Sequence, residues 1–336
     1  MKSTYKYSVL DLAIVSKGNT YNDTFKNSVA LAQNAEKNGF FRYWLAEHHN
    51  SDHIGSVATS VLIGHVAEKT NTIKVGSGGI MLPNHSPLII AEQFGTLGTL
   101  YSNRIDLGLG RAPGTDQETA HAINPNHNHS AISFPSEVTK IQNYFSEANL
   151  NGKVRANVAE GVNVPLYILG SSADSAHLAA KKGLPYAFAS HFATAKLFDA
   201  LKIYHEEFAP SEVLEKPYTM SGVNIIVADT DEEAERISTS LVKVIVGLLT
   251  GKRDYMQPPT EMTPDLKEMF KHPAVDQMLK YSFIGSKATV KNQVEDFLKQ
   301  TQVDELIAVT NIYSHTDRIK SYQLFAEIMN EINNEK

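Results

Sequence analysis

The stretch Phe40-Phe41-Arg42-Tyr43-Trp44-Leu45-Ala46-Glu47-His48-His49 joins an apolar and aromatic run to three ionisable residues. The run predicts a strand that ends at Glu47, His48 and His49. In a parallel α/β barrel, catalytic groups lie at the C-terminal ends of the strands. A histidine changes charge near neutral pH, so His48 beside Glu47 predicts a site for acid–base chemistry. The alternative is that one histidine supports the strand end through a hydrogen bond while the other is solvated.

The composition excludes several classes of protein. The chain has 336 residues, 42% hydrophobic and 20% charged, which is typical of a globular protein with a large core. The formal net charge of −6, with no basic block, disfavours a nucleic-acid partner. The absence of cysteine excludes disulfides, thiolate nucleophiles and cysteine-bound metals. With no signal-peptide core and no apolar run approaching about 20 residues, we expect a cytoplasmic protein without a membrane span.

Short apolar runs alternate with amphipathic stretches along the chain. They predict eight strands, over residues 7–13, 41–46, 73–80, 105–109, 165–169, 186–189, 221–228 and 305–310. They also predict helices over residues 22–38, 57–68, 87–101, 173–182, 194–208, 232–247 and 315–333. This alternation indicates an α/β protein with a (β/α)8 TIM barrel, in one domain over residues 1–336. No Gly-x-Gly-x-x-Gly opens a helix after a strand, which weighs against a Rossmann fold.

Two regions do not follow the alternation, residues 111–163 and 250–283. We expect both to be insertions after strands at the C-terminal face, where such loops shape the mouth of an active site. The second region contains Tyr255 and Met256 and ends at Phe283, which suggests an apolar lid over the mouth.

Two glycine-rich strand ends are candidate binding elements. Gly76-Ser77-Gly78-Gly79 would let the backbone approach a flat ligand closely, although glycines that only relieve packing against a helix are an equal alternative. Asp106-Leu107-Gly108-Leu109-Gly110-Arg111-Ala112-Pro113-Gly114 brings Arg111 to a strand end, where a guanidinium could hold a phosphate or a polarised carbonyl. Arg111 could equally form a structural ion pair, but its position at a strand end favours binding.

The segment Leu169-Gly170-Ser171-Ser172-Ala173-Asp174-Ser175 joins a strand to a helix. Free N–H groups, hydroxyls and the positive end of the helix dipole would form an anion site there, unless the serine is a plain helix cap. Ala189-Ser190-His191-Phe192 brings a further histidine to the same face of the barrel. His121, His127 and His129 suggest zinc, but they lack a zinc-protease spacing and lie among loop residues, so we predict no metal site.

Together these segments resemble the bacterial-luciferase-like family of flavin-dependent monooxygenases. The resemblance covers nearly the whole chain. It is carried by Arg42-Tyr43-Trp44-Leu45-Ala46-Glu47-His48-His49, Val75-Gly76-Ser77-Gly78-Gly79-Ile80-Met81-Leu82-Pro83, Arg104-Ile105-Asp106-Leu107-Gly108-Leu109-Gly110-Arg111-Ala112-Pro113-Gly114, Leu169-Gly170-Ser171-Ser172 and Gly183-Leu184-Pro185-Tyr186-Ala187-Phe188-Ala189-Ser190-His191-Phe192. These matching segments, in the right order, identify the family but not the substrate.

The resemblance implies that FMN binds at the C-terminal mouth. It assigns catalysis to His48 with Glu47 beside it, a non-proline cis peptide against the flavin ring to Gly78-Gly79, and phosphate binding to Arg111. It extends the cofactor site to Gly170, Ser171, Ser172 and Ser175, and we expect His191 to contact the cofactor as well. Gly110 stands where light-emitting members carry a cysteine, and Ser171 where they carry a glutamate, so luminescence does not carry over.

The activity that follows is a monooxygenase that uses reduced FMN and O2 on a small, apolar organic substrate. No second nucleotide motif is present, so an NAD(P)H-dependent flavin reductase is the expected supplier of reduced FMN. The resemblance also suggests a homodimer in which early helices pack together. The alternatives are a deazaflavin (F420)-dependent oxidoreductase of the same fold and a flavin-binding relative without turnover. A metal-dependent barrel hydrolase is disfavoured because no matching carboxylate spacing accompanies the histidines.

Overall fold

The computed structural model describes residues 4–252 and 254–335, in which strands and helices alternate. The strands are β1 (Lys6–Asp11), β2 (Arg42–Leu45), β3 (Lys74–Met81), β4 (Ile105–Gly110), β5 (Leu166–Gly170), β6 (Tyr186–Phe188), β7 (Thr219–Ala228), β8 (Ser282–Ser286) and β9 (Glu305–Val309). The helices are α1 (Tyr21–Lys37), α2 (Thr59–Glu68), α3 (Pro87–Leu100), α4 (Gln117–Ile123), α5 (His127–Ile132), α6 (Phe134–Phe145), α7 (Ala173–Lys182), α8 (Leu197–Glu207), α9 (Asp231–Thr250), α10 (Pro264–Lys271), α11 (Pro273–Leu279), α12 (Lys287–Thr301) and α13 (His315–Asn334), with 3₁₀ turns η1 (Leu82–Asn84) and η2 (Glu147–Asn151).

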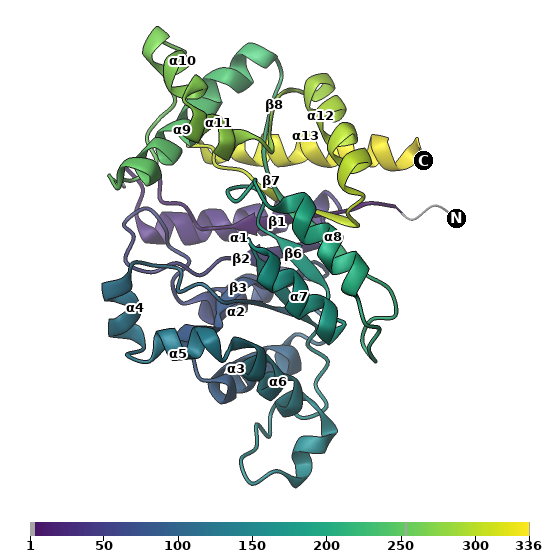
Figure 1. The fold of residues 1–336 in the computed structure, drawn as a ribbon. Coiled ribbons are helices and arrows are strands. Elements are labelled where there is room, and N and C mark those ends of the chain that lie inside the picture. Colours follow the sequence, from purple (N-terminus) through teal and green to yellow (C-terminus); the bar gives the residue numbers. More distant parts are fainter. Residues whose placement is uncertain (1–3, 253, 336) are drawn as a thin grey trace.

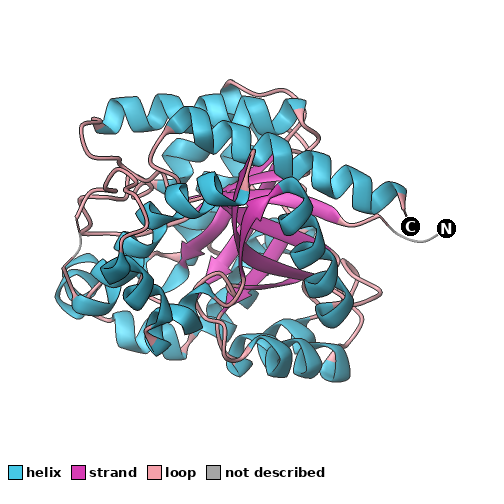
Figure 2. Ribbon diagram, turned by 90° about the horizontal axis from the view of Figure 1, so that it is seen from above, coloured by secondary structure: helices cyan, strands magenta, loops and turns pink. Residues whose placement is uncertain are grey.

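All strand pairings are parallel, and eight strands close into a barrel. The order runs β6-β5-β4-β3-β2-β1-β9-β7, and a β6–β7 pairing closes the ring. β8 lies outside the ring, where it pairs with the second half of β7 through Asn224–Ala228. Seen from above, the strands are enclosed by helices (Figure 2). The predicted (β/α)8 barrel is therefore confirmed, with one strand added.

The outer faces of the strands form the main core with the surrounding helices. Outward residues such as Val9, Tyr43 and Val75 are buried in this layer. The helices begin where the sequence supplies caps: Thr20 and Asp23 form a capping box at α1, and the Thr230 side chain accepts from Glu233 N at α9. In Figure 1, α9, α10 and α11 lie at one end of the molecule, while α3 and α6 lie toward the other.

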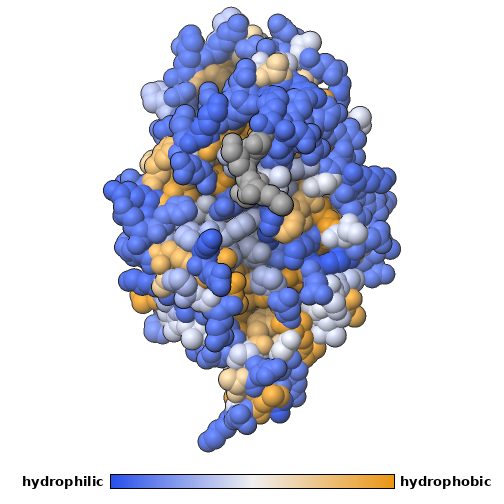
Figure 3. Space-filling model, turned by 90° about the vertical axis from the view of Figure 1, so that its right-hand side faces the viewer, coloured by the Kyte–Doolittle hydropathy of each residue, from blue (hydrophilic) through white to orange (hydrophobic). Residues whose placement is uncertain are grey.

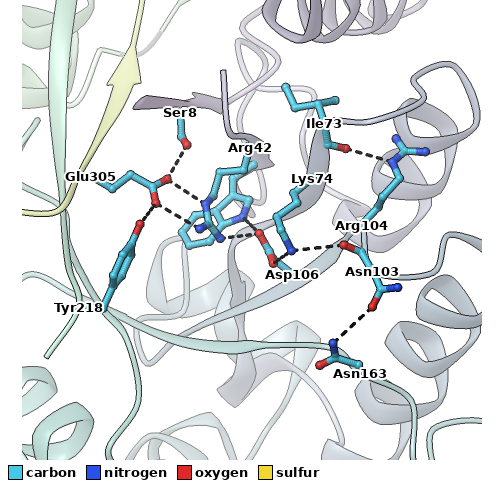
Figure 4. Close-up of polar contacts among 11 residues, drawn as sticks. Ser8, Arg42, Ile73, Lys74, Asn103, Arg104, Asp106, Asn163, Tyr218 and Glu305 are labelled. Atoms are coloured by element: carbon cyan, nitrogen blue, oxygen red, sulfur yellow. Dashed lines mark hydrogen bonds and ion pairs between the residues drawn. The ribbon is translucent and has the colours of Figure 1, made fainter. Parts of the chain in front are cut away.

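The inside of the barrel has two distinct regions. Its middle is filled by apolar side chains, including Leu10, Trp44, Tyr167, Met220 and Ile307. Its N-terminal end instead holds charged side chains from the first residues of the strands, shown in Figure 4. The N-terminal end is thus closed by side chains, and a ligand would enter at the C-terminal end.

Arg42 is the centre of the charged group at the N-terminal end. Its Nη1 donates to Asp106 Oδ2 at 2.6 Å, and its Nε and Nη2 donate to Glu305 at 2.8 and 3.1 Å. Tyr218 also donates to Glu305, at 2.6 Å, and Lys74 Nζ lies 4.0 Å from Asp106 Oδ1. Burial opposes the charge on Arg42, but the carboxylates of Glu305 and Asp106 raise its pKa well above the usual value. Burial raises the pKa of Asp106 despite the neighbouring cations.

The structure departs from the predicted elements in the last third of the chain. β8 and α12 were not predicted. A five-residue strand that contains Gly285 has no clear periodicity, whereas α12 has buried residues at helical spacing, Val290, Val294 and Leu298, that the prediction overlooked. Phe283 accordingly lies in β8 and packs against Phe297 of α12, with ring centroids 5.5 Å apart, and not at the mouth. Residues 111–163 contain α4 to α6, of which α6 packs on α3 as a helix of the outer layer.

The molecular surface is mainly hydrophilic on the side viewed in Figure 3, with apolar residues in separate patches. Within the described part of the chain, no helix is both long and apolar enough to cross a membrane.

Replacing Arg42 with methionine should lower the free energy of unfolding by about 3–5 kcal/mol. The substitution leaves two buried carboxylates, those of Asp106 and Glu305, without their shared cation. Urea denaturation followed by circular dichroism measures the change. Arg155→Met, which removes an exposed pair with Glu160, is the matched control and should change stability much less. A loss below about 1 kcal/mol for Arg42→Met would show that the buried network is dispensable.

Candidate active site at the C-terminal end of the barrel

The residues that the sequence predicts for the site lie at the C-terminal ends of five neighbouring strands. Glu47 and His48 follow β2, Gly78-Gly79 lies within β3, Arg111 follows β4, Gly170-Ser171 ends β5, and His191 follows β6. These strands are adjacent in the barrel, in the order β2 to β6. Segments up to 144 positions apart in sequence, from Glu47 to His191, therefore meet at the C-terminal end of the barrel.

Glu47 is a buried carboxylate that connects two strand ends. Its oxygens accept from His49 Nε2 at 2.9 Å, from His85 Nε2 at 2.9 and 3.0 Å, from Met81 N at 2.9 Å and from Asn84 Nδ2 at 3.1 Å. An ionised carboxylate only accepts hydrogen bonds, so both histidines carry a proton on Nε2. Glu47 thereby fixes the residues that follow β3 against the end of β2.

The charge of Glu47 is stabilised by these donors. Burial alone would raise its pKa, but the hydrogen bonds from His49, His85 and Asn84 outweigh burial and lower the pKa to about 2. A carboxylate that stays ionised at neutral pH is a poor proton donor. This geometry supports a positioning role for Glu47 beside the predicted catalytic histidine.

His48 is partly buried and is oriented by the loop after β4. Its Nδ1 donates to the Gly114 carbonyl oxygen at 3.3 Å, and the same oxygen accepts from His49 N at 3.1 Å. A carbonyl oxygen cannot donate, so the hydrogen of the neutral ring is on Nδ1. The lone pair is then on Nε2, which is the nitrogen that can take up a proton.

His191 faces the same mouth from the opposite wall, since β2 and β6 are four strands apart in the eight-stranded ring. Burial, with a smaller contribution from the nearby His48, lowers the pKa of His191 to about 4. The backbone oxygen of His191 accepts from Asn224 Nδ2 at 2.7 Å. The lowered pKa keeps His191 neutral at pH 7.

The wall between these histidines has little side-chain bulk. The Gly78–Gly79 peptide is cis, as the resemblance implied. A Cβ at Gly78 would lie 2.7 Å from Leu10 Cδ1, and one at Gly79 would lie 2.7 Å from the Gly108 carbonyl oxygen. Close packing therefore favours glycine at both positions, and this part of β3 carries no side chain.

The ends of β4 and β5 form a polar corner. Arg111 is exposed, and its Nη2 lies 3.0 Å from Asp174 Oδ2 in the first turn of α7. Ser172 is the N-cap of α7 but makes no side-chain cap hydrogen bond. Ser175 Oγ donates to the Ser172 carbonyl oxygen at 2.6 Å and lies 2.9 Å from the Tyr186 hydroxyl. The corner thus combines a guanidinium, serine hydroxyls and a helix N-terminus, the groups that bind a phosphate.

The region predicted as a lid passes over the end of β1. Met256 is buried and pairs with the loop after β1: Met256 N donates to the Val15 oxygen at 3.0 Å and Lys17 N to the Met256 oxygen at 2.9 Å. Tyr255 is exposed. The strap of residues 254–257 is therefore held by main-chain hydrogen bonds, while α10 and α11 follow it.

Sequence reasoning missed several residues of the site: Asn84, His85, Gly114, Gly222 and Asn224. His85 could have been found, because it is a histidine in the short loop between the predicted strand over residues 73–80 and the predicted helix over residues 87–101. The Gly114 contact could not, since nothing in the sequence indicates which carbonyl meets the His48 ring. Within residues 4–252 and 254–335, no group of three or more histidine, aspartate or glutamate side chains is placed to hold a metal ion.

Comparisons with known proteins show the family of this chain. A family model described as luciferase-like monooxygenase matches residues 6–305. The chain is 48% identical to the protein YvbT of Bacillus subtilis, covering 96% of both chains. It is 45% identical to a luciferase-like monooxygenase of Escherichia coli strain K12, covering 98% of both. It is 28% identical to the N-acetyl-S-alkylcysteine monooxygenase of Bacillus subtilis, covering 96% of this chain and 97% of that one.

Solved structures show the same fold. Apo-MsnO8 superposes with a TM-score of 0.88 at 29% identity, covering 97% of this chain and 98% of that one. The oxygenating constituent of 3,6-diketocamphane monooxygenase from Pseudomonas putida, solved with FMN, gives 0.72 at 15% identity and 96% and 97% coverage. An F420-dependent secondary alcohol dehydrogenase with an F420-acetone adduct gives 0.70 at 15% identity and 95% and 97% coverage.

Replacing Glu47 with glutamine should remove a pH-dependent part of the stability. The pKa of Glu47 is about 2 in the folded chain and near its usual, higher value in the unfolded chain. Its contribution is therefore complete above about pH 5 and is lost as the pH falls toward 2; a shift of this size corresponds to about 3 kcal/mol. Denaturant titrations of the native protein and of Glu47→Gln between these pH values measure the free energy of unfolding. It should fall less on acidification in Glu47→Gln than in the native protein. An equal fall in both proteins would contradict this prediction.

Proposed function

Because this chain belongs to the luciferase-like monooxygenase family, we propose that it is a flavin-dependent monooxygenase. It would use reduced FMN and O2 to oxidise a small, mainly apolar organic substrate. The observation that carries this proposal is the side-chain-free wall at Gly78-Gly79, next to His48 and to the polar corner at α7. Within one mouth, the glycine wall would take the flat ring, the polar corner at α7 would take the phosphate, and His48 would transfer the proton.

The residues present fit an FMN. Its planar ring suits the wall at Gly78 and Gly79, which carries no side chain. Close packing favours glycine at both positions, because an added Cβ would collide with neighbouring atoms. Its phosphate suits Arg111, Ser171, Ser172 and the N–H groups at the start of α7, whose side-chain cap is missing. Arg111 would exchange its exposed contact with Asp174 for a phosphate, which gains a paired, charge-assisted hydrogen bond. Ser175 would order this loop through Ser172 and Tyr186.

When bound, the flavin would supply the oxidation–reduction chemistry with O2. His48 would hold or release the proton at Nε2, because the Gly114 carbonyl keeps the hydrogen of the neutral ring on Nδ1. Glu47 would keep the surrounding loops in place through His49 and His85. The strap of residues 254–257 would restrict access of water to the mouth, which favours substrate oxidation over wasteful side reactions.

A second candidate is an oxidoreductase that transfers a hydride with the deazaflavin F420. The structural similarity to an F420-dependent alcohol dehydrogenase supports it. Both cofactors carry a flat ring and phosphate, so the same wall and corner would serve either. Absorbance and fluorescence of the bound cofactor distinguish the two.

The proposed monooxygenase needs partners. An NAD(P)H-dependent flavin reductase would supply reduced FMN, and O2 would be the second substrate. For the organic substrate, the N-acetyl-S-alkylcysteine monooxygenase among the relatives makes thioethers a class to screen first. A thioether also has the apolar character that we expect of the substrate.

The test is an anaerobic titration with photoreduced FMN, followed by rapid mixing with O2 while flavin absorbance is recorded. We expect saturable binding and a reoxidation rate that differs from that of free FMN. Reoxidation identical to that of free flavin, or no binding, would contradict the FMN proposal and favour the deazaflavin.

Replacing His48 with alanine should leave binding of reduced FMN nearly unchanged. With a substrate found in the screen, it should lower turnover by about 10²–10⁴, the usual contribution of a general acid or base. His129→Ala, on α5, is the matched control and should keep native turnover. An unchanged rate in His48→Ala would remove its assigned role.

We also propose a homodimer built on α2 and α3. Val61 on α2 and Leu100 on α3 are 68% and 66% exposed, and Ile89 on α3 is 46% exposed. Light scattering should give twice the chain mass for the native protein and a lower mass for the double variant Val61→Lys, Leu100→Lys, since two charges would enter the interface. Val213→Lys, exposed on the loop after α8, is the control. A native monomer would contradict the proposal.

A further inference from the structure

His191 is held rigidly at the barrel mouth. Its ring lies against Gly222 of β7, where an added Cβ would be 2.5 Å from Nδ1 and 3.3 Å from Cε1. Phe192 packs on the ring edge-to-face, with centroids 4.9 Å apart. Asn224 Nδ2 donates to the backbone oxygen of His191 at 2.7 Å, and also to Ser282 Oγ at 3.1 Å. A glycine on β7 therefore makes the space in which this ring sits.

The environment of Nδ1 decides where the ring carries its hydrogen. Nδ1 is fully buried and has no hydrogen-bond partner among the described residues. A hydrogen at Nδ1 would be a buried donor without an acceptor, which is rarer in proteins and more costly than a buried lone pair. The hydrogen of the neutral ring is therefore on Nε2, at the ring edge away from Gly222.

The same environment keeps the ring uncharged. Protonation would add the unsatisfied donor at Nδ1, and burial together with the nearby His48 lowers the pKa of His191 to about 4. His48 is the titratable group that acts on His191 from across the mouth, and its contribution is smaller than that of burial. The neighbours on β7 and on its own loop, Gly222, Asn224 and Phe192, carry no charge. Near pH 7 the His191 ring is then a neutral hydrogen-bond donor that does not take up a second proton.

We propose that His191 is a permanently neutral hydrogen-bond donor whose Nε2–H binds a carbonyl-type acceptor on the ring system of the flavin. His48 and His191 then have separate tasks: His48 transfers protons, and His191 orients the ligand without changing charge. The identity of the ligand rests on the proposed flavin function, whereas the state of the ring rests on the contacts of His191 alone.

The first experiment is nitrogen NMR of protein labelled with ¹⁵N-histidine, with the His191 signals assigned by comparison with His191→Gln. We expect a single neutral form with the hydrogen on Nε2 between about pH 5.5 and pH 8, the range in which an ordinary histidine titrates. A midpoint inside that range, or a hydrogen on Nδ1, would overturn the inference whatever the protein binds.

The second experiment is the anaerobic titration with photoreduced FMN on three variants. His191→Leu removes the donor and should weaken binding about 3- to 10-fold, the effect of one neutral hydrogen bond. His191→Gln places an amide N–H near the position of Nε2 and should restore most of the affinity. Gly222→Ala should weaken binding as well, because its methyl group would displace the ring. His205→Leu, at an exposed histidine of α8, is the matched control.

The outcomes separate this inference from the proposed function. If native protein binds FMN and His191→Leu binds it equally well, the role of His191 is wrong and the flavin proposal stands. If His191→Gln is as weak as His191→Leu, the donor is not what matters, and the inference is again wrong. If native protein does not bind FMN, the flavin proposal fails and the ligand assigned to His191 fails with it. Weaker binding in His191→Leu and recovery in His191→Gln support the inference.

Discussion

The ion pair network around Arg42 is the constraint on which the barrel depends. A guanidinium on β2 bonds to Asp106 on β4 and to Glu305 on β9, so it links strands on both sides of its own. Removing charges from water is costly, and only complete pairing compensates the cost. Because Arg42 and Glu305 are 263 positions apart, their pairing is satisfied only when the ring of strands is closed. The network therefore ties the register of the strands to closure of the barrel.

This closed end explains why the other end is available for chemistry. Charged side chains occupy the N-terminal end and apolar ones fill the middle, while glycines border the mouth at Gly78, Gly79 and Gly222. Loops after the strands then contribute polar groups without disturbing the packed interior. The N-terminal end and the middle of the barrel thus form a packed support, and the loops at the C-terminal end carry the polar groups. This division is expected for a fold that hosts many reactions.

Within the mouth, polar groups are fixed by neighbours that do not themselves face the ligand. Glu47 fixes His49 and His85, the Gly114 carbonyl fixes His48, and Gly222 leaves space for His191. Apart from the local pair of Glu47 and His49, each of these partners comes from a different strand or loop than the group that it fixes. Orientation of the predicted site residues is thus largely a property of the assembled barrel, because the contacts of His85, His48 and His191 each join two strand ends.

The sequence by itself determined the eight barrel strands to within a few residues, the strand-end position of Glu47-His48 and the glycine pair at 78 and 79. These features are local, since periodicity, helix caps and glycine-rich turns depend only on residues that are close in the sequence. It did not determine β8, because a short strand outside the ring has no strong local pattern. Only the tertiary structure decided that His85 bonds to Glu47, that Gly114 orients His48 and that His191 faces His48 from the opposite wall. These relations depend on closure of the barrel, which brings together residues that no local pattern connects.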